Sequence, residues 1–181
     1  MKALVTGGAG FIGSHLVSEL LKEDISELII YDNFTRGNLD NIQASLNDER
    51  CYIFPDGGDI RDVDVLNKAM KDVNYVFHLA AMWLLHCKDY PRTAFHVNIE
   101  GTFNLVKEIL IHQKKYKKKI KIIQISSDAV YPSTRGNYGE TSKLGPYNVY
   151  GWTKLASEFL IKMIEKHMII RTRFYKKSLI K

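Results

Sequence analysis

The feature that most constrains the fold is a cluster of four glycines close to the N-terminus. The stretch KALVTGGAGFIGSHLVSEL, residues 2–20, places Gly7, Gly8, Gly10 and Gly13 between an apolar run and an amphipathic one. Glycine weakens any regular element because it has more backbone freedom to lose than other residues. Four together therefore indicate either a flexible joint or a backbone that passes very close to something else.

Short apolar runs alternate with helical patterns along the chain. The runs that predict strands are 2–6, 27–32, 51–54, 74–80, 119–127 and, more weakly, 169–174. The segments that predict helices are 11–23, 38–47, 62–71, 92–113 and 148–167. Such alternation is typical of βαβ units with right-handed crossovers. We therefore predict an α/β fold, a Rossmann-like doubly wound parallel sheet of about six strands with helices on both faces.

The glycines join the first predicted strand to the first predicted helix. Residues 8–13 fit the pattern G-x-G-x-x-G, in which the glycines allow a tight turn and a close approach to a pyrophosphate. Asp32 ends the second predicted strand, 19 residues after Gly13, where a carboxylate can accept hydrogen bonds from both ribose hydroxyls. It would repel a 2′-phosphate, so NAD is favoured over NADP, although Arg36 nearby counts slightly against that choice.

Composition excludes several classes of function. The 181 residues carry a net charge of +6, but the excess is concentrated in the lysine run 114–121 and the last dozen residues. A solvated helix end explains that run better than a nucleic-acid patch. No apolar run is long enough to span a membrane, and no basic leader precedes an apolar segment. Cys51 and Cys87 lack metal-type spacing, so we expect reduced thiols, no metal and a cytoplasmic location.

GGAGFIG with YDN resembles the extended short-chain dehydrogenase/reductase family, which includes NAD-dependent sugar-nucleotide epimerases and dehydratases. The glycine motif of this family is G-x-x-G-x-x-G, which here corresponds to Gly7, Gly10 and Gly13. The resemblance continues through GDIRD, HLAA, VNIEGTFNLV, SSDAVY and YGWTK, in order, to about residue 160. It implies NAD as cofactor and a nucleotide sugar, in particular a UDP sugar, as substrate.

The resemblance also implies individual roles. Asp59 and Ile60 would contact adenine, Ala80 and Ala81 would lie along the cofactor, and Asn98 would steady the active-site backbone. The cofactor-binding residues that it implies are Gly7, Gly10, Phe11, Ile12, Gly13, Asp32, Asn33, Asp59, Ile60, Ala80, Ala81, Asn98, Tyr150 and Lys154. Its catalytic residues are Ser127, Tyr150 and Lys154.

The chemistry of the catalytic set can also be argued from the residues. Tyr150 and Lys154 are four apart and share one helix face. A free tyrosine titrates near about 10 and is a poor base at neutral pH. A nearby ammonium and an oxidised nicotinamide should lower that pKa, so that Tyr150 can take a proton from a sugar hydroxyl. Ser127 ends the fifth predicted strand and could hydrogen-bond the reacting oxygen.

One departure from the family pattern narrows the activity. Dehydratases follow the catalytic Ser or Thr with Asp-Glu, whereas this chain has Asp128 and Ala129. The missing Glu argues against dehydration and favours a UDP-glucose 4-epimerase-like reaction. A nucleotide-sugar dehydratase or reductase remains the alternative.

The length leaves a second alternative open. Family members are generally longer, and their C-terminal part supplies much of the nucleotide-sugar pocket. We therefore expect an NAD-binding domain at 1–175, a basic tail at 176–181 and no C-terminal substrate domain. The chain could be a truncated NAD-binding module without turnover, with apolar surface exposed on its last helix and strand. Family dimers pair two helices per subunit, and 92–113 and 148–167 could do so here.

His78 and the stretch MWLLHC, residues 82–87, contain metal-type side chains without ligand spacing. We expect them to pack in the core or the wall of a pocket, with Trp83 on the sugar side of the cleft.

Overall fold

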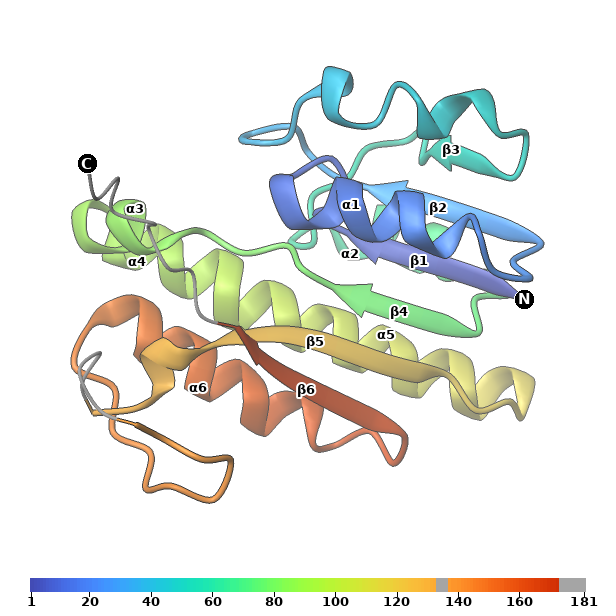
Figure 1. Cartoon of the computed structure of the whole chain (residues 1–181). Coiled ribbons are helices and arrows are strands. Elements are labelled where there is room, and N and C mark those ends of the chain that lie inside the picture. The colour runs from blue at the N-terminus through green and yellow to red at the C-terminus, as the bar shows by residue number, and fades with distance from the viewer. Residues whose placement is uncertain (133–136, 173–181) are drawn as a thin grey trace.

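One parallel sheet organises the chain. The computed structural model describes residues 1–132 and 137–172. Its strands are β1 (Lys2–Thr6), β2 (Glu27–Tyr31), β3 (Cys51–Ile53), β4 (Tyr75–His78), β5 (Lys121–Ser127) and β6 (His167–Thr172). All neighbours pair in parallel, in the order β3-β2-β1-β4-β5-β6 (Figure 1). The predicted six-stranded, doubly wound sheet is confirmed, and its order reverses at β1 and β4, where open α/β sheets bind ligands.

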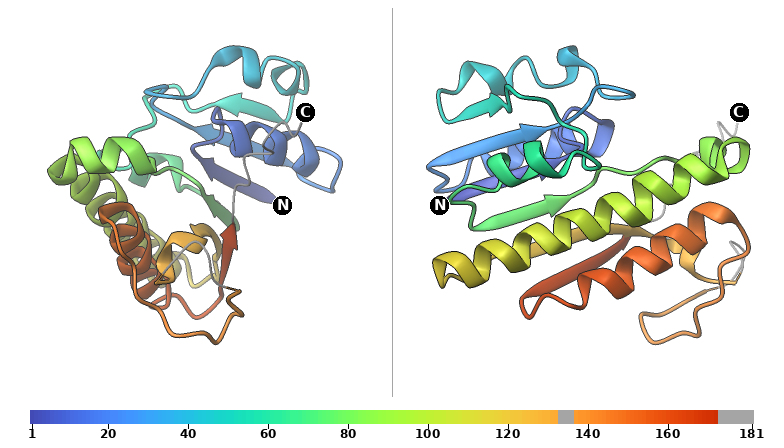
Figure 2. Two further views of the ribbon diagram at one scale, coloured as in Figure 1. Left: turned by 60° about the vertical axis from the view of Figure 1, so that its left-hand side comes forward. Right: turned by 180° about the vertical axis from the view of Figure 1, so that it is seen from behind.

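Helices connect the strands and cover the sheet. They are α1 (Phe11–Leu20), α2 (Val63–Ala69), α3 (Leu84–Asp89), α4 (Pro91–Ala94), α5 (Gly101–Tyr116) and α6 (Val149–Ile161). A π-helical stretch, η3 (Phe95–Glu100), joins α4 to α5, and short 3₁₀ turns lie at η1 (Leu39–Asn41), η2 (Ser45–Asn47) and η4 (Asp128–Val130). Helices α5 and α6 run side by side on one face, and α1 lies on the other (Figure 2).

Alternation of side chains along each strand divides the core between the two faces. Leu4, Ile29 and Val76 belong to the cluster that packs under α2, α5 and α6. Val5 and Ile30, one position further along, belong to the cluster under α1. The near-continuous apolar strands of the sequence are explained by this burial on both faces.

The structure differs from the predicted elements at four places. Residues 38–47 form η1 and η2 in place of a helix, because the Asn38 amide and the Asn41 side chain both donate to the Ala9 carbonyl and tie this segment to the glycine turn. Helix α3 was not predicted. Helix α6 ends at Ile161, and β6 begins at His167, two residues before the predicted strand. The end of that predicted strand and the predicted tail lie outside the described residues.

Candidate active site

The glycine turn is shaped by two close backbone approaches. Gly7 has a φ of +72°, and a Cβ there would lie 2.8 Å from the Ala80 nitrogen. A Cβ on Gly13 would lie only 2.1 Å from the Gly7 carbonyl oxygen. Gly10 precedes α1 without any side-chain cap, and Phe11 is 74% exposed. The turn therefore presents the unsatisfied backbone N–H groups of a ten-residue helix, which is the arrangement that binds phosphates.

Asp32 follows β2 and lies beside this turn. Its Oδ2 accepts from the Ala9 amide at 2.9 Å, and its Oδ1 accepts from the Phe34 amide at 2.9 Å. These bonds fix the carboxylate while each oxygen keeps a second lone pair for a ligand. The neighbouring Asn33 is exposed, and its side chain reaches Asp59 Oδ2 at 3.4 Å.

Asp59 and Ile60 have separate roles in the structure. The Arg61 guanidinium donates to Asp59 at 2.9 Å and lowers the pKa of its carboxyl, so Asp59 stays ionised. The Ile60 side chain is only 3% exposed and packs against Gly101, where an added Cβ would lie 2.6 Å from it. The Ile60 side chain is therefore packed against the start of α5, and the adenine contact predicted for Ile60 stays a prediction.

Asn98 connects three parts of the site. It lies in the π-helical stretch η3 and is 2% exposed. Its side chain accepts from the Met82 amide at 2.6 Å and donates to the Met82 carbonyl at 3.1 Å, just after Ala80 and Ala81. It also donates to Thr153 Oγ1 on α6 at 2.9 Å. Asn98 therefore holds the loop after β4 against the helix that carries Tyr150 and Lys154.

Ser127, Tyr150 and Lys154 meet at the carboxyl end of β5. Ser127 ends that strand, and its hydroxyl hydrogen-bonds the Tyr150 phenol. Asn148 caps the start of helix α6, because its side chain accepts a hydrogen bond from the Gly151 amide at 2.8 Å. Tyr150 therefore lies in the first turn of the helix. Lys154, one turn later, is 4% exposed and donates to the Ile125 carbonyl at 2.7 Å.

The protonation of this set differs from the sequence-based expectation in one respect. Burial raises the pKa of Tyr150, and the hydrogen bond with Ser127 only partly offsets that effect. Burial also lowers the pKa of Lys154 to about 8, against the opposing influence of Glu158. The expected lowering of the Tyr150 pKa is therefore not built into the protein alone, because Lys154 is desolvated and directed to a backbone carbonyl.

A buried histidine chain, which sequence reasoning did not assign, supports the site. Thr102 Oγ1 donates to the Asn98 carbonyl at 2.7 Å, so it accepts from His78 Nε2 at 2.9 Å. His78 Nδ1 then accepts from the Thr6 hydroxyl at 2.8 Å. Burial, helped by the charge of Lys154, lowers the pKa of His78 to about 3 and keeps it neutral. The predicted packing role of His78 agrees with its 1% exposure.

A second support lies behind Lys154. Glu158 is 1% exposed and receives the Arg171 guanidinium at 3.0 Å on Oε1 and 2.8 Å on Oε2, together with the Ser126 hydroxyl at 2.6 Å. Arg171 also donates to the Tyr131 hydroxyl at 2.9 Å. Glu158 could have been found from the sequence by its spacing. Tyr150, Lys154 and Glu158 are each four residues apart, which places them on one helix face.

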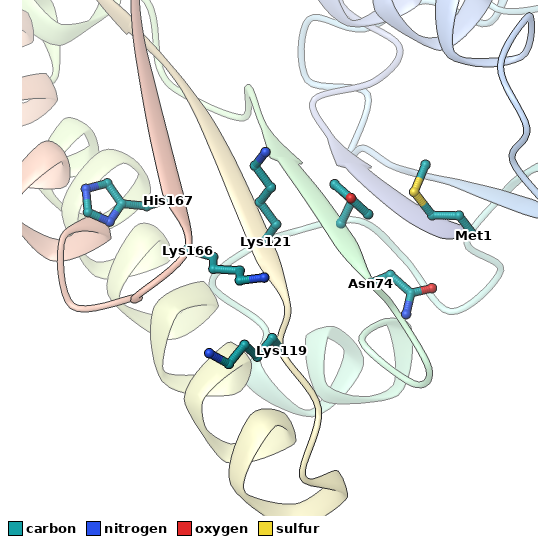
Figure 3. Close-up of a pocket in the computed structure, with 7 residues that line it drawn as sticks. Met1, Asn74, Lys119, Lys121, Lys166 and His167 are labelled. Carbon is teal, nitrogen blue, oxygen red and sulfur yellow. The ribbon is translucent and has the colours of Figure 1, made fainter.

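One hollow lies at the opposite end of the strands from this site and is not part of it. It is lined by Met1, Asn74, Tyr75, Lys119, Lys121, Lys166 and His167, at the amino ends of the strands (Figure 3). A second hollow lies at the carboxyl end of β6, between Arg171 and the segment Asn137–Glu140, and includes Asp128 next to Ser127. Ligands of parallel α/β sheets bind at the carboxyl ends, so only the second adjoins the candidate site.

Residues 1–132 and 137–172 contain no group of three His, Cys, Asp or Glu side chains that could hold a metal ion. None of the helices in this part of the chain is long and apolar enough to cross a membrane.

Known proteins resemble this chain in sequence and in fold. The family model described as GDP-mannose 4,6 dehydratase matches residues 4–175. A putative UDP-glucose 4-epimerase from Methanocaldococcus jannaschii is 36% identical over 168 residues, which cover 90% of this chain and 50% of that protein. The chain thus spans about half the length of the curated relatives that it matches.

Solved structures extend the comparison. UDP-glucuronic acid 4-epimerase from Bacillus cereus, in complex with UDP-glucuronic acid and NAD, has a TM-score of 0.81 at 33% identity, over 94% of this chain and 56% of that one. A dTDP-glucose 4,6-dehydratase from Streptomyces venezuelae with NAD bound has a TM-score of 0.81 at 30% identity, over 90% and 51%. With these matches and the glycine turn, Asp32 and the Ser127-Tyr150-Lys154 set, the chain belongs to the NAD-dependent nucleotide-sugar epimerase and dehydratase family.

Proposed function

We propose that this chain carries the cofactor and catalytic half of an NAD-dependent nucleotide-sugar 4-epimerase. The observation that carries the proposal is the meeting of Ser127, Tyr150 and Lys154 at the carboxyl edge of the sheet. They lie beside the switch point, and Asn98 connects their helix to the loop after β4. This is where a parallel sheet presents a ligand to side chains from several elements.

NAD fits the residues present. The close approaches at Gly7 and Gly13 leave room for a pyrophosphate at the start of α1, and Asp32 keeps lone pairs for ribose hydroxyls. Asn33, Ala80 and Ala81 lie on the loops that flank this turn, and Phe11 and Ile12 begin the helix. When bound, NAD would supply a hydride acceptor that later returns the hydride to the opposite face of the sugar.

The side chains then have separate tasks. Tyr150 takes the proton of the sugar hydroxyl that is oxidised, and it returns a proton when that oxygen is reduced. Ser127 donates a hydrogen bond to the same oxygen. Lys154, buried and close to Ile125, supplies the positive charge that opposes protonation of Tyr150 and can also hold the nicotinamide ribose.

A UDP sugar is the substrate that we propose. The epimerases among the relatives carry this substrate in their names, including the Methanocaldococcus jannaschii and Bacillus cereus proteins. Ala129 stands where a dehydratase would place the Glu that helps to remove water, which favours epimerisation over dehydration. A dTDP-glucose 4,6-dehydratase is also among the matches, so dehydration or reduction is the competing chemistry.

The test is interconversion of UDP-glucose and UDP-galactose with and without Tyr150. Wild type should convert one into the other, and Tyr150→Phe should lower the rate by about 10²–10⁴-fold while NAD binding persists. Ser127→Ala serves as a second catalytic variant with a smaller loss. NAD binding without any conversion by wild type would instead support the binding module without turnover that the short chain leaves open. Release of water from a 4,6-dehydratase substrate would support dehydration.

A homodimer is part of the proposal. Helices α5 and α6 lie side by side, and several large apolar side chains on them and just after α6 are exposed. We call these side chains the helix face: Phe103, Ile111, Trp152, Phe159 and Met163. Two copies could bury this face as a four-helix bundle. Sedimentation of wild type as a dimer and of Phe159→Glu as a folded monomer would support it, and a wild-type monomer at high concentration would contradict it.

Domain limits and location complete the proposal. We propose residues 1–175 as one NAD-binding domain, supported by the family match to 4–175, and 176–181 as a basic tail. A cytoplasmic location is supported by Cys51 and Cys87, which are both buried free thiols.

A further inference from the structure

The lysine run of the sequence is only partly explained by the end of α5. Lys114 and Lys115 lie in the last turn of that helix, where positive charge interacts favourably with the helix dipole. The helix ends at Tyr116. Lys119 and Lys121 lie beyond it, before and at the start of β5, so the helix end does not account for them.

Lys119 and Lys121 lie on the face of the sheet opposite to α5. Ile120 and Ile122 are fully buried in the cluster under α2, α5 and α6. Because side chains alternate along an extended strand, the two lysines face the other way. Lys121 there lies next to Tyr75, its partner in register on β4.

A third lysine, Lys166, joins them at the amino ends of the strands, in what we call the amino-end hollow (Figure 3). Lys166 directly precedes β6, and its carbonyl accepts from the Ile122 amide at 3.1 Å, which brings this segment against β5. The hollow has a volume of about 680 Å³, a size that is typical of small-ligand sites. The residues that line it are Met1, Asn74, Tyr75, Lys119, Lys121, Lys166 and His167.

The positive charge of the amino-end hollow is not balanced by the chain. None of the described residues that line it is acidic. Lys119 forms an ion pair with Glu165 at 3.1 Å, in which both side chains are mostly exposed. Within residues 1–132 and 137–172, Lys121 and Lys166 form no ion pair. Like charges that share a hollow repel each other, and a bound anion would relieve that repulsion.

Asn74 adds a fixed neutral donor to the lysines. Its Oδ1 accepts from the Lys2 amide at 2.9 Å, and its own backbone amide donates to the Lys2 carbonyl at 2.9 Å. These bonds leave the side-chain N–H groups of Asn74 for a ligand. His167 is not part of the charge cluster, because its Nδ1 donates to the Ile164 carbonyl at 2.7 Å and its ring points away from the lysines (Figure 3).

We infer that the amino-end hollow binds a small polyphosphate, separately from the cleft at the carboxyl ends of the strands. Ammonium groups act as compact point charges on phosphate oxygens, and several of them together suit an anion that carries several charges. Three separate segments of the chain line the hollow, which encloses a short phosphate chain better than it fits a nucleic-acid duplex. The inference goes beyond the proposed function and does not depend on it.

Calorimetric titration of the full chain with inorganic tripolyphosphate tests the inference, at a physiological ionic strength of about 0.15 M. The hollow pair Lys121→Gln/Lys166→Gln should weaken tripolyphosphate binding by about tenfold or more, because two charged contacts are lost. The control pair Lys107→Gln/Lys143→Gln removes the same charge from exposed positions outside the hollow. This control should change the affinity by less than about twofold, as expected for distant surface charges. Melting temperatures close to that of wild type would establish that both pairs are folded.

Two sources share this chemistry, namely a free polyphosphate and the phosphate chain of a nucleoside triphosphate. ATP and UTP, titrated in the presence of saturating NAD, distinguish them. Affinities equal to that of tripolyphosphate assign the site to the phosphate chain alone. A higher affinity for either nucleotide, lost in the hollow pair, assigns it to a nucleoside triphosphate.

Several results would overturn the inference and leave the proposed function intact. They are wild type that does not bind tripolyphosphate at about 1 mM, and a control pair that loses as much affinity as the hollow pair. Displacement of tripolyphosphate by NAD would place it in the cofactor cleft. Single-stranded oligothymidylate that binds the hollow more than about tenfold tighter would assign the hollow to nucleic acid. A chain that does not bind NAD would overturn the proposed function alone, because the hollow pair still reports on the hollow.

Discussion

The two halves of the sheet are stabilised in different ways. Strands β3, β2, β1 and β4 lie between α1 and the 3₁₀ turns on one face and α2 and α5 on the other, and Leu4 and Ile29 are at most 1% exposed. Strands β5 and β6 are covered by α5 and α6 on one face. On their other face, Met168 and Ile170 are 45% and 41% exposed, without a covering helix among the described residues.

The two halves therefore rely on different stabilising interactions. In the first half, apolar burial on both faces and close glycine contacts hold the cofactor loops. In the second half, a polar network joins β6 to α6 through Glu158 and Arg171, and a cation–π contact places Arg171 over Tyr131 at 5.3 Å. The first half is thus held by packing alone, whereas a buried ion pair joins α6 to the edge strand in the second half.

The largest expected effect tests that ion pair. Arg171→Met leaves the Glu158 carboxylate buried without its cation, which should lower the free energy of unfolding by about 3–5 kcal/mol. Urea denaturation measures the loss. The double variant Arg171→Met/Glu158→Leu removes both charges and should recover more than half of it. A single variant as stable as wild type would show that β6 is not held by this pair.

Replacing one glycine in each half by alanine compares how tightly the backbone is packed there. A Cβ on Gly13 would lie 2.1 Å from the Gly7 carbonyl oxygen, so Gly13→Ala must displace the turn. This variant should lower the free energy of unfolding by about 2–4 kcal/mol and should also weaken NAD binding. Gly139, in the loop beside β6, has nothing within 4 Å of such a Cβ, and Gly139→Ala should stay within about 0.5 kcal/mol. Thermal unfolding and NAD titration of both variants measure these effects. Equal losses of stability in Gly13→Ala and Gly139→Ala would contradict the prediction.

Lys154, where the halves meet, predicts a pH dependence. Burial lowers its pKa to about 8, below the ordinary value of a lysine, so the unfolded chain binds more protons than the folded chain between these two pKa values. The Lys154 contribution to stability should therefore rise with pH from about 8 to 10, by roughly 1 kcal/mol per pH unit at most. Comparing unfolding of wild type and Lys154→Met across this range isolates it from the tyrosines and cysteines. A difference that stays constant with pH would contradict the lowered pKa.

The smallest expected effects come from removing one methyl group from an isoleucine in each half of the sheet. Ile29 is 1% exposed and Ile170 is 41% exposed. Ile29→Val should cost about 1 kcal/mol, and Ile170→Val less than about 0.3 kcal/mol, because only the first leaves a cavity in a closed core. Denaturation of both variants under identical conditions measures the difference. A comparable cost at Ile170 would show that its side chain is covered in solution, for example by a second copy.

Local patterns determined most of the sheet and the cofactor loop. Each strand is an apolar run bounded by polar residues. The requirement for glycine at position 13 comes from the Gly7 carbonyl six residues earlier, whereas that at Gly7 also involves the distant Ala80. The segment 38–47 was wrong as a helix because Asn38 and Asn41 bond a distant carbonyl, at Ala9, which no local pattern reports. Helix α3 is only six residues long, too short for periodicity to identify.

The sequence by itself determined the alternation of strands and helices, the glycine turn with Asp32, and the pairing of Tyr150 with Lys154 on one helix face. Only the tertiary structure decided how these groups are supported: the Asn98 bridge, the neutral His78 chain, and Arg171 on Glu158. It also decided that the Tyr150 pKa is raised. Spacing along a chain fixes neighbours one turn apart, whereas desolvation and long-range hydrogen bonds depend on which distant segments the packed sheet brings together.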